Sequence, residues 1–413
     1  MFDLTKALAT KAKPVLTTSS GVAGCTLFYQ SQECLNLVQE VFLFEGWDEP
    51  ACVNTTAGLT KVTEQQSSHI VILELNESSN VVEDAKAFAS KLPTHKGVVV
   101  IGKEDAISTL RSLKEMGFYY VFWPVNKQEF ADFLTHVSKN LKTFSGVSQK
   151  RKAKHVAIVG SKGGVGASFI STELGSLLST QGSDTILVDH QNAGTNIDVL
   201  LGLKDFMPRT IDEFTTPLHE MDEEGALSYL FNARKHLRLL AIDGEKSPSG
   251  IFNYSQTLCG LLARNTNFII EDFSGAVDFK VEPQLLVENF DVVVLVFDAS
   301  VSSVRNAKRL YEKIESLQLT LSSRTRIIMV ANYHRPKNSF VLEKSDLNKY
   351  LGMSVDLEFD YCKSLAHIII DGKRGHKHDR NISHSMEQLV KLINGQPIDQ
   401  KAMNSWLKKV RVK

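Results

Sequence analysis

One glycine-rich segment holds the residues best suited to bind a ligand. Residues 160–168 read GSKGGVGAS, at the end of the apolar run HVAIVG and before the amphipathic run FISTELGSLLSTQG. Glycines let successive backbone N–H groups turn toward one point, and the start of a helix adds partial positive charge. This segment is therefore either a phosphate-binding loop or a tight turn between strand and helix that binds no ligand. The candidate lining residues are Gly163, Gly164, Val165, Gly166, Ala167, Ser168 and Phe169.

Polar side chains also end three further apolar runs. Asp189 ends ILVD, Asp272 ends FIIED, and Asn332 ends RIIMVAN. The carboxyl ends of parallel strands share one edge of a sheet, where α/β proteins bind ligands. Carboxylates in this position could bind a cation or polar groups of a ligand. Taken singly, each of these residues is more often a helix cap, but three in order favour a site.

The glycine-rich segment fails the plain P-loop pattern GxxxxGK[ST], because Ser161 and Ala167 replace a glycine and the lysine. It resembles instead KGGxGK[ST], the deviant Walker A loop of the ParA/MinD ATPases. The resemblance implies ATP and magnesium as cofactors. It also implies that Lys162 reaches a partner's nucleotide across a dimer and that Ser168 is a magnesium ligand. Ala167 lacks the second lysine and Phe169 lacks a hydroxyl, so we expect weakened binding or hydrolysis.

The strand-terminal acids are similar to switch residues of the same family. Asp189 matches the first acid of switch I, near magnesium, and Gln191 stands where a second acid would act on the attacking water. A glutamine can hold water but cannot take a proton, so hydrolysis should be slow or absent. The segment 268–275, FIIEDFSG, resembles Walker B and switch II. The resemblance implies that Asp272 binds magnesium through water and that Gly275 lies beside a γ-phosphate. The resemblance puts Asn332 on the adenine edge. The candidate catalytic residues are Lys162, Asp189 and Gln191.

These residues need a framework of alternating strands and helices. The second half supplies apolar runs at 155–160, 184–189, 237–242, 267–272, 291–297 and 326–332, with amphipathic stretches at 169–182 and 304–317. The first half alternates in the same way between 25 and 141, with a weak additional strand near 51–53. This pattern predicts parallel sheets covered by helices on both faces. The polar, basic stretch SGVSQKRKAK at 145–154 is the expected linker between two α/β domains.

The first domain resembles the receiver of response regulators, ending in Trp123 and Pro124 where receivers have Lys-Pro. Gln30, Ser31, Glu74 and Gly102 replace its phosphotransfer residues, so a docking role is implied. Glu74 either imitates a phosphorylated aspartate or is a solvated or capping glutamate. The aromatic residues at 118–120 and 122 form either a contact face or core. The expected fold is a receiver-like (flavodoxin-like) parallel sheet followed by a doubly wound P-loop NTPase sheet of MinD/ParA type.

The expected boundaries are a tail at 1–20, the receiver-like domain at 21–144, the linker at 145–154, the ATPase-like domain at 155–396 and a tail at 397–413. With residues 346–373, this order resembles the TadZ/CpaE branch. That branch implies a homodimeric scaffold or polar landmark in assembly of Flp/Tad type IV pili, which recruits the Tad pilus assembly ATPase. The alternatives are an active ParA/MinD-like ATPase that positions cargo and a scaffold that binds no nucleotide.

Composition limits the remaining choices. The chain has 413 residues, and 47 basic residues balance 47 acidic ones, so no DNA binding is expected. Five scattered cysteines and the lack of a long apolar run indicate a cytoplasmic protein that is neither exported by the usual route nor membrane-spanning. The basic amphipathic tail MNSWLKKVRVK either contacts the inner membrane peripherally, docks on its own domain or is solvated.

Overall fold

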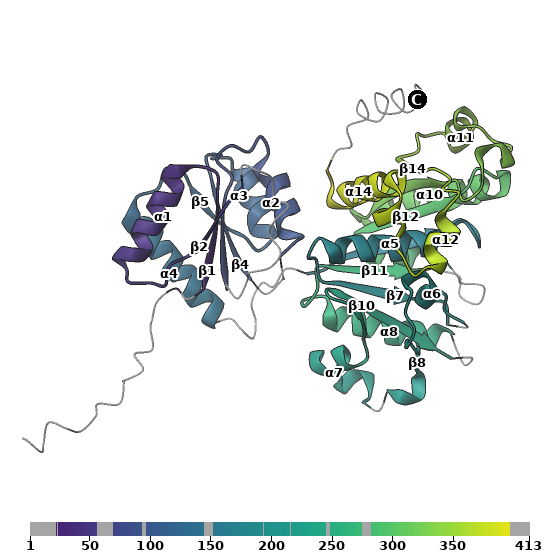
Figure 1. Ribbon diagram of the computed structural model, residues 1–413, viewed down its shortest axis with the longest axis horizontal. Coiled ribbons are helices and arrows are strands. Elements are labelled where there is room, and N and C mark those ends of the chain that lie inside the picture. The colour runs from purple at the N-terminus through teal and green to yellow at the C-terminus, as the bar shows by residue number, and fades with distance from the viewer. Residues whose placement is uncertain are drawn as a thin grey trace, which may run out of the picture. The chain divides into compact units, whose positions relative to one another are not determined.

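The computed structural model describes residues 22, 24–55, 69–92, 96–143, 152–192, 194–214, 216–244, 248–274 and 282–396. These residues form two compact units, each built around one sheet (Figure 1). Both predicted tails, most of the predicted linker and Gly275 lie outside the described residues. Among the described helices, none is long and apolar enough to cross a membrane.

The first unit is a five-stranded parallel sheet in the order β2-β1-β3-β4-β5. This is the flavodoxin-like order. The weak strand signal near 51–53 is confirmed as β2, which pairs with β1. The strands are β1 (Cys25–Tyr29), β2 (Ala51–Asn54), β3 (Ile70–Glu74), β4 (Gly97–Gly102) and β5 (Tyr119–Phe122). The helices that follow these strands are α1 (Gln32–Phe44), α2 (Val81–Ala89), α3 (Ile107–Glu115) and α4 (Lys127–Thr143). The division into compact units groups the segment Ser78–Lys96, which includes α2, with the second unit.

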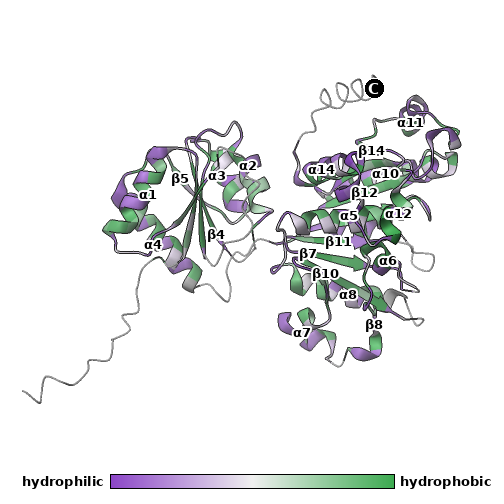
Figure 2. Cartoon of the chain, in the orientation of Figure 1, coloured by the Kyte–Doolittle hydropathy of each residue, from purple (hydrophilic) through white to green (hydrophobic). Residues whose placement is uncertain are grey.

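The core of this unit follows from the helical period of α1 and α4. Apolar residues spaced three and four apart face the sheet, among them Val38 and Phe42 of α1 and Phe130 and Leu134 of α4. Figure 1 shows α1 and α4 on one side of the sheet and α3 on the other. Figure 2 shows the strands as hydrophobic, while the helices mix hydrophobic and hydrophilic residues.

Glu74 is the last residue of β3, and its side chain is fully buried. Its Oε2 accepts hydrogen bonds from the backbone N–H groups of Gln30 at 2.7 Å and Ser31 at 2.9 Å. Its Oε1 accepts from the Ser31 hydroxyl at 2.5 Å and the Asn76 amide at 2.6 Å. The expectation of a solvated glutamate is therefore wrong, whereas a capping role fits, because the carboxylate accepts the N–H groups of the residues that lead into α1. It joins the end of β3 to the loop between β1 and α1.

Aromatic rings also fill the space near the ends of β4 and β5. A Cβ added at Gly102 would lie 2.7 Å from the Tyr120 hydroxyl, which itself donates to the Glu104 carbonyl. The side chain of Trp123 packs in the hydrophobic core of this unit. The aromatic residues divide between the two expected roles: Phe118 is buried, whereas Phe122 is 47% exposed.

The second unit is a nine-stranded sheet in the order β14-β13-β12-β6-β11-β7-β10-β8, with β9 paired to β10. The strands are β6 (Lys154–Gly160), β7 (Thr185–Asp189), β8 (Arg209–Thr210), β9 (Phe231–Arg234), β10 (Leu237–Asp243), β11 (Phe268–Asp272), β12 (Val292–Phe297), β13 (Arg326–Asn332) and β14 (Leu357–Phe359). β9 is antiparallel to β10, which the parallel pattern did not predict. A two-residue turn, Lys235 and His236, makes this reversal, and His236 takes a φ of 63°.

Helices cover both faces of this sheet. α5 and α14 pack on one face, and α8, α9 and α10 pack on the other. The helices are α5 (Ala167–Thr180), α6 (Ile197–Leu201), α7 (Glu223–Ser228), α8 (Pro248–Leu262), α9 (Pro283–Asn289), α10 (Val301–Leu321), α11 (Lys344–Leu351), α12 (Leu365–Ile370), α13 (Gly375–His378) and α14 (Arg380–Asn394). β6 is central, and it delivers the glycine-rich loop to the middle of the sheet edge.

We predict that Glu74→Ala destabilises the protein by about 2 kcal/mol or more, because two buried N–H groups lose their acceptor. Urea unfolding of the full chain measures the change. Glu77→Ala, at an exposed position three residues on, is the control and should change stability by less than about 0.5 kcal/mol. Equal stability of the two variants would show that the hydrogen bonds of the Glu74 carboxylate do not stabilise the protein.

Candidate nucleotide-binding site

The glycine-rich loop joins the end of β6 to the start of α5, as its sequence predicts. Gly164 and Gly166 take φ values of +78° and +86°, which glycine adopts at little cost. Gly166 is the N-cap of α5, and no described side chain caps this helix. The first turn of α5 therefore points backbone N–H groups toward the loop, an arrangement suited to a phosphate.

Asn332 at the end of β13 fixes the shape of this loop. Its buried amide donates to the Val165 carbonyl at 2.8 Å. A Cβ on Gly166 would collide with the same amide nitrogen. The structure thus gives Asn332 a partner inside the loop, and its contact with an adenine edge stays a prediction.

Asp189 and Asp272 end adjacent strands and stand opposite each other in the register of β7 and β11. Both are almost fully buried. Burial, and then the charge of Asp272, raise the pKa of Asp189. Burial likewise raises the pKa of Asp272, although hydrogen bonds from Ser274 and Ser168 oppose it. Two buried carboxylates side by side favour a bound proton or a cation.

The surroundings of Asp272 fit a magnesium ion. Its Oδ1 accepts from the Ser274 N–H at 3.0 Å, whereas Oδ2 has no hydrogen-bond partner among the described residues. The hydroxyl of Ser168 contacts that of Ser274 beside it. Mg²⁺ prefers carboxylate, hydroxyl and water oxygens, so Ser168, Asp189 and Asp272 would hold it here. The ion would neutralise charge on a bound phosphate.

Lys162 has partners within its own chain. Its ammonium group lies 3.2 Å from Asp298 Oδ2 and donates to the Ser300 hydroxyl at 2.9 Å. Burial would raise the pKa of Asp298, but hydrogen bonds from Ser300 and the contact with Lys162 outweigh it and lower that pKa. A role of Lys162 across a dimer therefore requires that this ion pair first separate.

Ala167 and Phe169, the two residues of the loop that depart from the family pattern, are packed in the apolar core. Ala167 is 2% exposed within the core that α5 forms with the sheet, and Phe169 packs against the same core. Gln191 lies in the loop after β7. Its N–H donates to Asp189 Oδ1 at 2.9 Å, and its side-chain amide donates to the Gly194 carbonyl at 2.8 Å. Gly275 lies outside the described residues, so its role stays a prediction.

Two further groups at this edge were not predicted from the sequence. The Thr195 hydroxyl donates to Asp189 Oδ2 and accepts from the Ile197 N–H that begins α6. On the opposite face of β11, the buried pair His190 and Glu271 is joined at 2.7 Å between Nε2 and Oε2. The signal that could have revealed this pair is the glutamate inside the apolar run FIIED, which a buried strand accepts only with a partner.

We predict that Gly166→Ala lowers the free energy of unfolding by about 1–2 kcal/mol or more, because an alanine is strained at this φ and its Cβ displaces Asn332. Gly163→Ala is the matched control. Gly163 has no positive φ, and an added Cβ would meet no atom within 4 Å. Urea unfolding compares the two variants, and an equal loss of stability in both would refute the proposed contact with Asn332.

Comparison with family models identifies the family of the second unit. The model of the CobQ/CobB/MinD/ParA nucleotide binding domain matches residues 156–398, more than half of the chain. No curated protein compared with the chain matches it.

Solved structures with a similar fold include a ParA family ATPase from Chlorobium tepidum TLS, at 17% identity and a TM-score of 0.48 over 57% of this chain and 96% of that chain. The cell division protein MinD from Aquifex aeolicus has 22% identity and a TM-score of 0.45, over 60% and 99% of the two chains. The septum site-determining protein MinD from Pyrococcus horikoshii OT3, complexed with Mg-ADP, has 12% identity and a TM-score of 0.45, over 58% and 96%. On the match of its second unit, the chain belongs to the CobQ/CobB/MinD/ParA nucleotide-binding domain family.

Proposed function

We propose that this protein binds ATP with magnesium, hydrolyses it slowly or not at all, and acts as a nucleotide-controlled dimeric scaffold. The carrying observation is the buried oxygen Oδ2 of Asp272, which has no partner in the described chain and lies beside Asp189 and Ser168. A buried carboxylate oxygen of this kind is costly unless a cation or water occupies the space beside it. Magnesium bound with a nucleotide meets that need.

Slow hydrolysis follows from two side chains. Ala167 offers no ammonium group to the phosphates, so charge that develops on them lacks one fixed countercharge. Gln191 holds the loop carbonyl of Gly194 and cannot accept a proton from water. Binding then depends mainly on loop N–H groups and on the magnesium ligands, which suits a switch better than a motor.

We further propose a place for this scaffold in Flp/Tad pilus assembly, a type IV pilus and type II secretion-like machine. The support is the order of the two units: a receiver-like sheet without phosphotransfer residues, then a MinD/ParA-type domain. In this proposal the protein dimerises, marks the cell pole as a cytoplasmic landmark peripheral to the inner membrane, and recruits the Tad pilus assembly ATPase with other pilus components. The first unit then serves docking rather than signal reception.

Calorimetry of ATP binding to the full chain, with and without magnesium, tests the proposed cofactors. We expect micromolar, magnesium-dependent binding that Asp272→Asn weakens at least about tenfold. Asp243→Asn, an exposed acid at the end of β10, is the control and should bind as the parent does. Absence of binding by the parent protein would refute the nucleotide switch and favour a nucleotide-free scaffold, whereas rapid turnover would favour an active ATPase.

Light scattering with ATP tests the role of Lys162 in dimer formation. If Lys162 acts across the dimer, Lys162→Ala should remove the ATP-dependent dimer and leave most ATP binding in place. Lys308→Ala, on the exposed side of α10, should dimerise normally. A Lys162→Ala variant that still dimerises with ATP would contradict this role.

Restoring the lost charge provides a gain-of-function test. We predict that Ala167→Lys raises ATP affinity about tenfold, because an ammonium group at the start of α5 can reach the phosphates. Ala167→Met controls for side-chain length without charge, and it should not raise affinity. Equal behaviour of the two variants would show that the missing lysine does not limit binding.

A further inference from the structure

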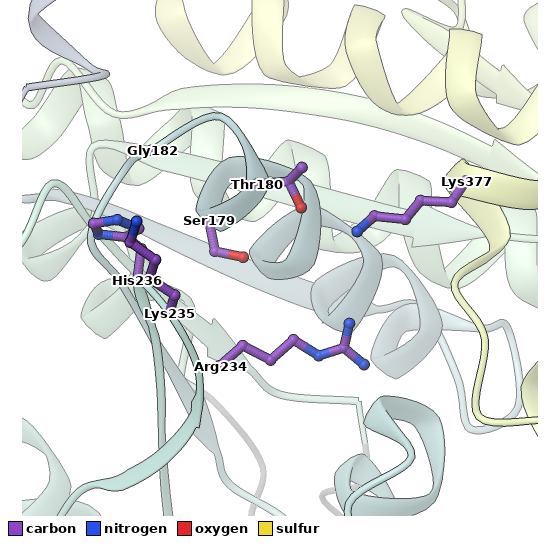
Figure 3. Close-up of a pocket in the computed structure, with 7 residues that line it drawn as sticks. All are labelled: Ser179, Thr180, Gly182, Arg234, Lys235, His236 and Lys377. Carbon is purple, nitrogen blue, oxygen red and sulfur yellow. The ribbon is translucent and has the colours of Figure 1, made fainter. Parts of the chain in front are cut away.

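A pocket lined by basic side chains lies at the end of α5 that is remote from the glycine-rich loop (Figure 3). Its volume is about 280 Å³. α5 has 14 residues, so its two ends are separated by about 21 Å at 1.5 Å per residue. The pocket is therefore separate from the nucleotide site and is not part of the proposed function.

One side of the pocket is the two-residue turn between β9 and β10. Arg234, Lys235 and His236 follow one another there and all line the pocket. The positive φ of His236 allows a tight two-residue turn, which keeps these three consecutive basic residues close together. The Nη2 of Arg234 donates to the Leu201 carbonyl at 3.1 Å, which fixes one face of the guanidinium group.

The other side combines the end of α5 with α13. Ser179 and Thr180 contribute hydroxyl groups, and Lys377 contributes an ammonium group. Figure 3 shows Arg234 and Lys377 extending from different elements toward the same space, with both hydroxyl oxygens facing it. The pocket thus offers donors from three separate elements.

A buried clamp holds Lys377 in place. The neighbouring His376 donates its N–H to Glu173 Oε2 at 2.9 Å, and its ring nitrogen Nδ1 lies 2.5 Å from the same oxygen. The N–H of Gly375 donates to Glu173 Oε1 at 2.9 Å. Burial would raise the pKa of Glu173, but these hydrogen bonds lower it, so the carboxylate stays charged. The backbone of Lys377 is therefore anchored to α5.

Positive charge in the pocket is largely uncompensated. No carboxylate is among the lining residues. Asp184 lies beside the pocket, but its carboxylate is 2.8 Å from His236 Nδ1. Within the described part of the chain, neither Lys235 nor Lys377 forms an ion pair. Arg234 and Lys377 therefore bring a guanidinium and an ammonium group to one space, and Lys235 adds a second ammonium group to the lining on the side of the turn.

We propose that this pocket binds a phosphate group carried by a small polar molecule or by a lipid headgroup. A phosphate monoester carries up to two negative charges and the phosphodiester of a lipid headgroup carries one. Both present several acceptor oxygens, which match convergent donors from Arg, Lys and Ser/Thr. The volume is at the low end for ligand sites, and the lining has no apolar ring surface for a base. The shared chemistry is thus a phosphate with a compact polar substituent.

Calorimetry with inorganic phosphate and with glycerol 3-phosphate tests the proposal on the full chain. Lys235→Gln and Lys377→Gln should each weaken binding about fivefold to tenfold, because each removes one charged donor. Lys373→Gln is the matched control: it removes the same charge from an exposed lysine that pairs with Asp371 outside the pocket. Binding that survives in both pocket variants, or that falls equally in the control, would overturn the assignment.

Flotation with vesicles distinguishes the two sources of phosphate. Binding to phosphatidylglycerol vesicles that is absent with phosphatidylcholine and is lost in Lys235→Gln and Lys377→Gln supports a lipid headgroup. Binding of glycerol 3-phosphate without vesicle binding supports a soluble phosphate ester. If neither glycerol 3-phosphate nor phosphatidylglycerol binds through these lysines, the pocket is not a phosphate site.

Discussion

The pairing of Asp189 with Asp272 is the constraint on which the nucleotide site depends. Strand order places the ends of β7 and β11 side by side, and burial removes the water that would screen two negative charges. The surrounding hydroxyl groups of Thr195, Ser274 and Ser168 are arranged around this pair. The edge of the sheet is therefore built to receive positive charge even though its loop lacks a lysine at position 167.

The sequence predicted the architecture because strand and helix periods are local properties. Unbroken apolar runs such as DVVVLVF give buried parallel strands wherever helices cover both faces. The same reasoning located the loop and its acids, since these residues follow directly on strands. It could not predict contacts between distant segments: Asn332 closes on Val165, and Lys162 finds Asp298 more than a hundred residues away. It also missed β9, whose reversal depends on the unusual backbone of His236.

In the first unit, one buried carboxylate connects two segments that are distant in the sequence. A glutamate is one methylene longer than an aspartate, and at position 74 that length lets the carboxylate reach the loop between β1 and α1. Tyr120 and Trp123 fill the space near the ends of β4 and β5 with aromatic rings. Glu74 therefore ties the end of β3 to the loop between β1 and α1.

Helix α6 forms hydrogen bonds both to the region of Asp189 and to two arginines on other elements. Its first N–H binds the Thr195 hydroxyl, which also holds Asp189, and its last carbonyls, on Leu200 and Leu201, accept from Arg374 and Arg234. Five residues of helix form a short rigid rod. One short helix therefore shares its hydrogen bonds between Thr195, which holds Asp189, and two arginines, one of which lines the basic pocket.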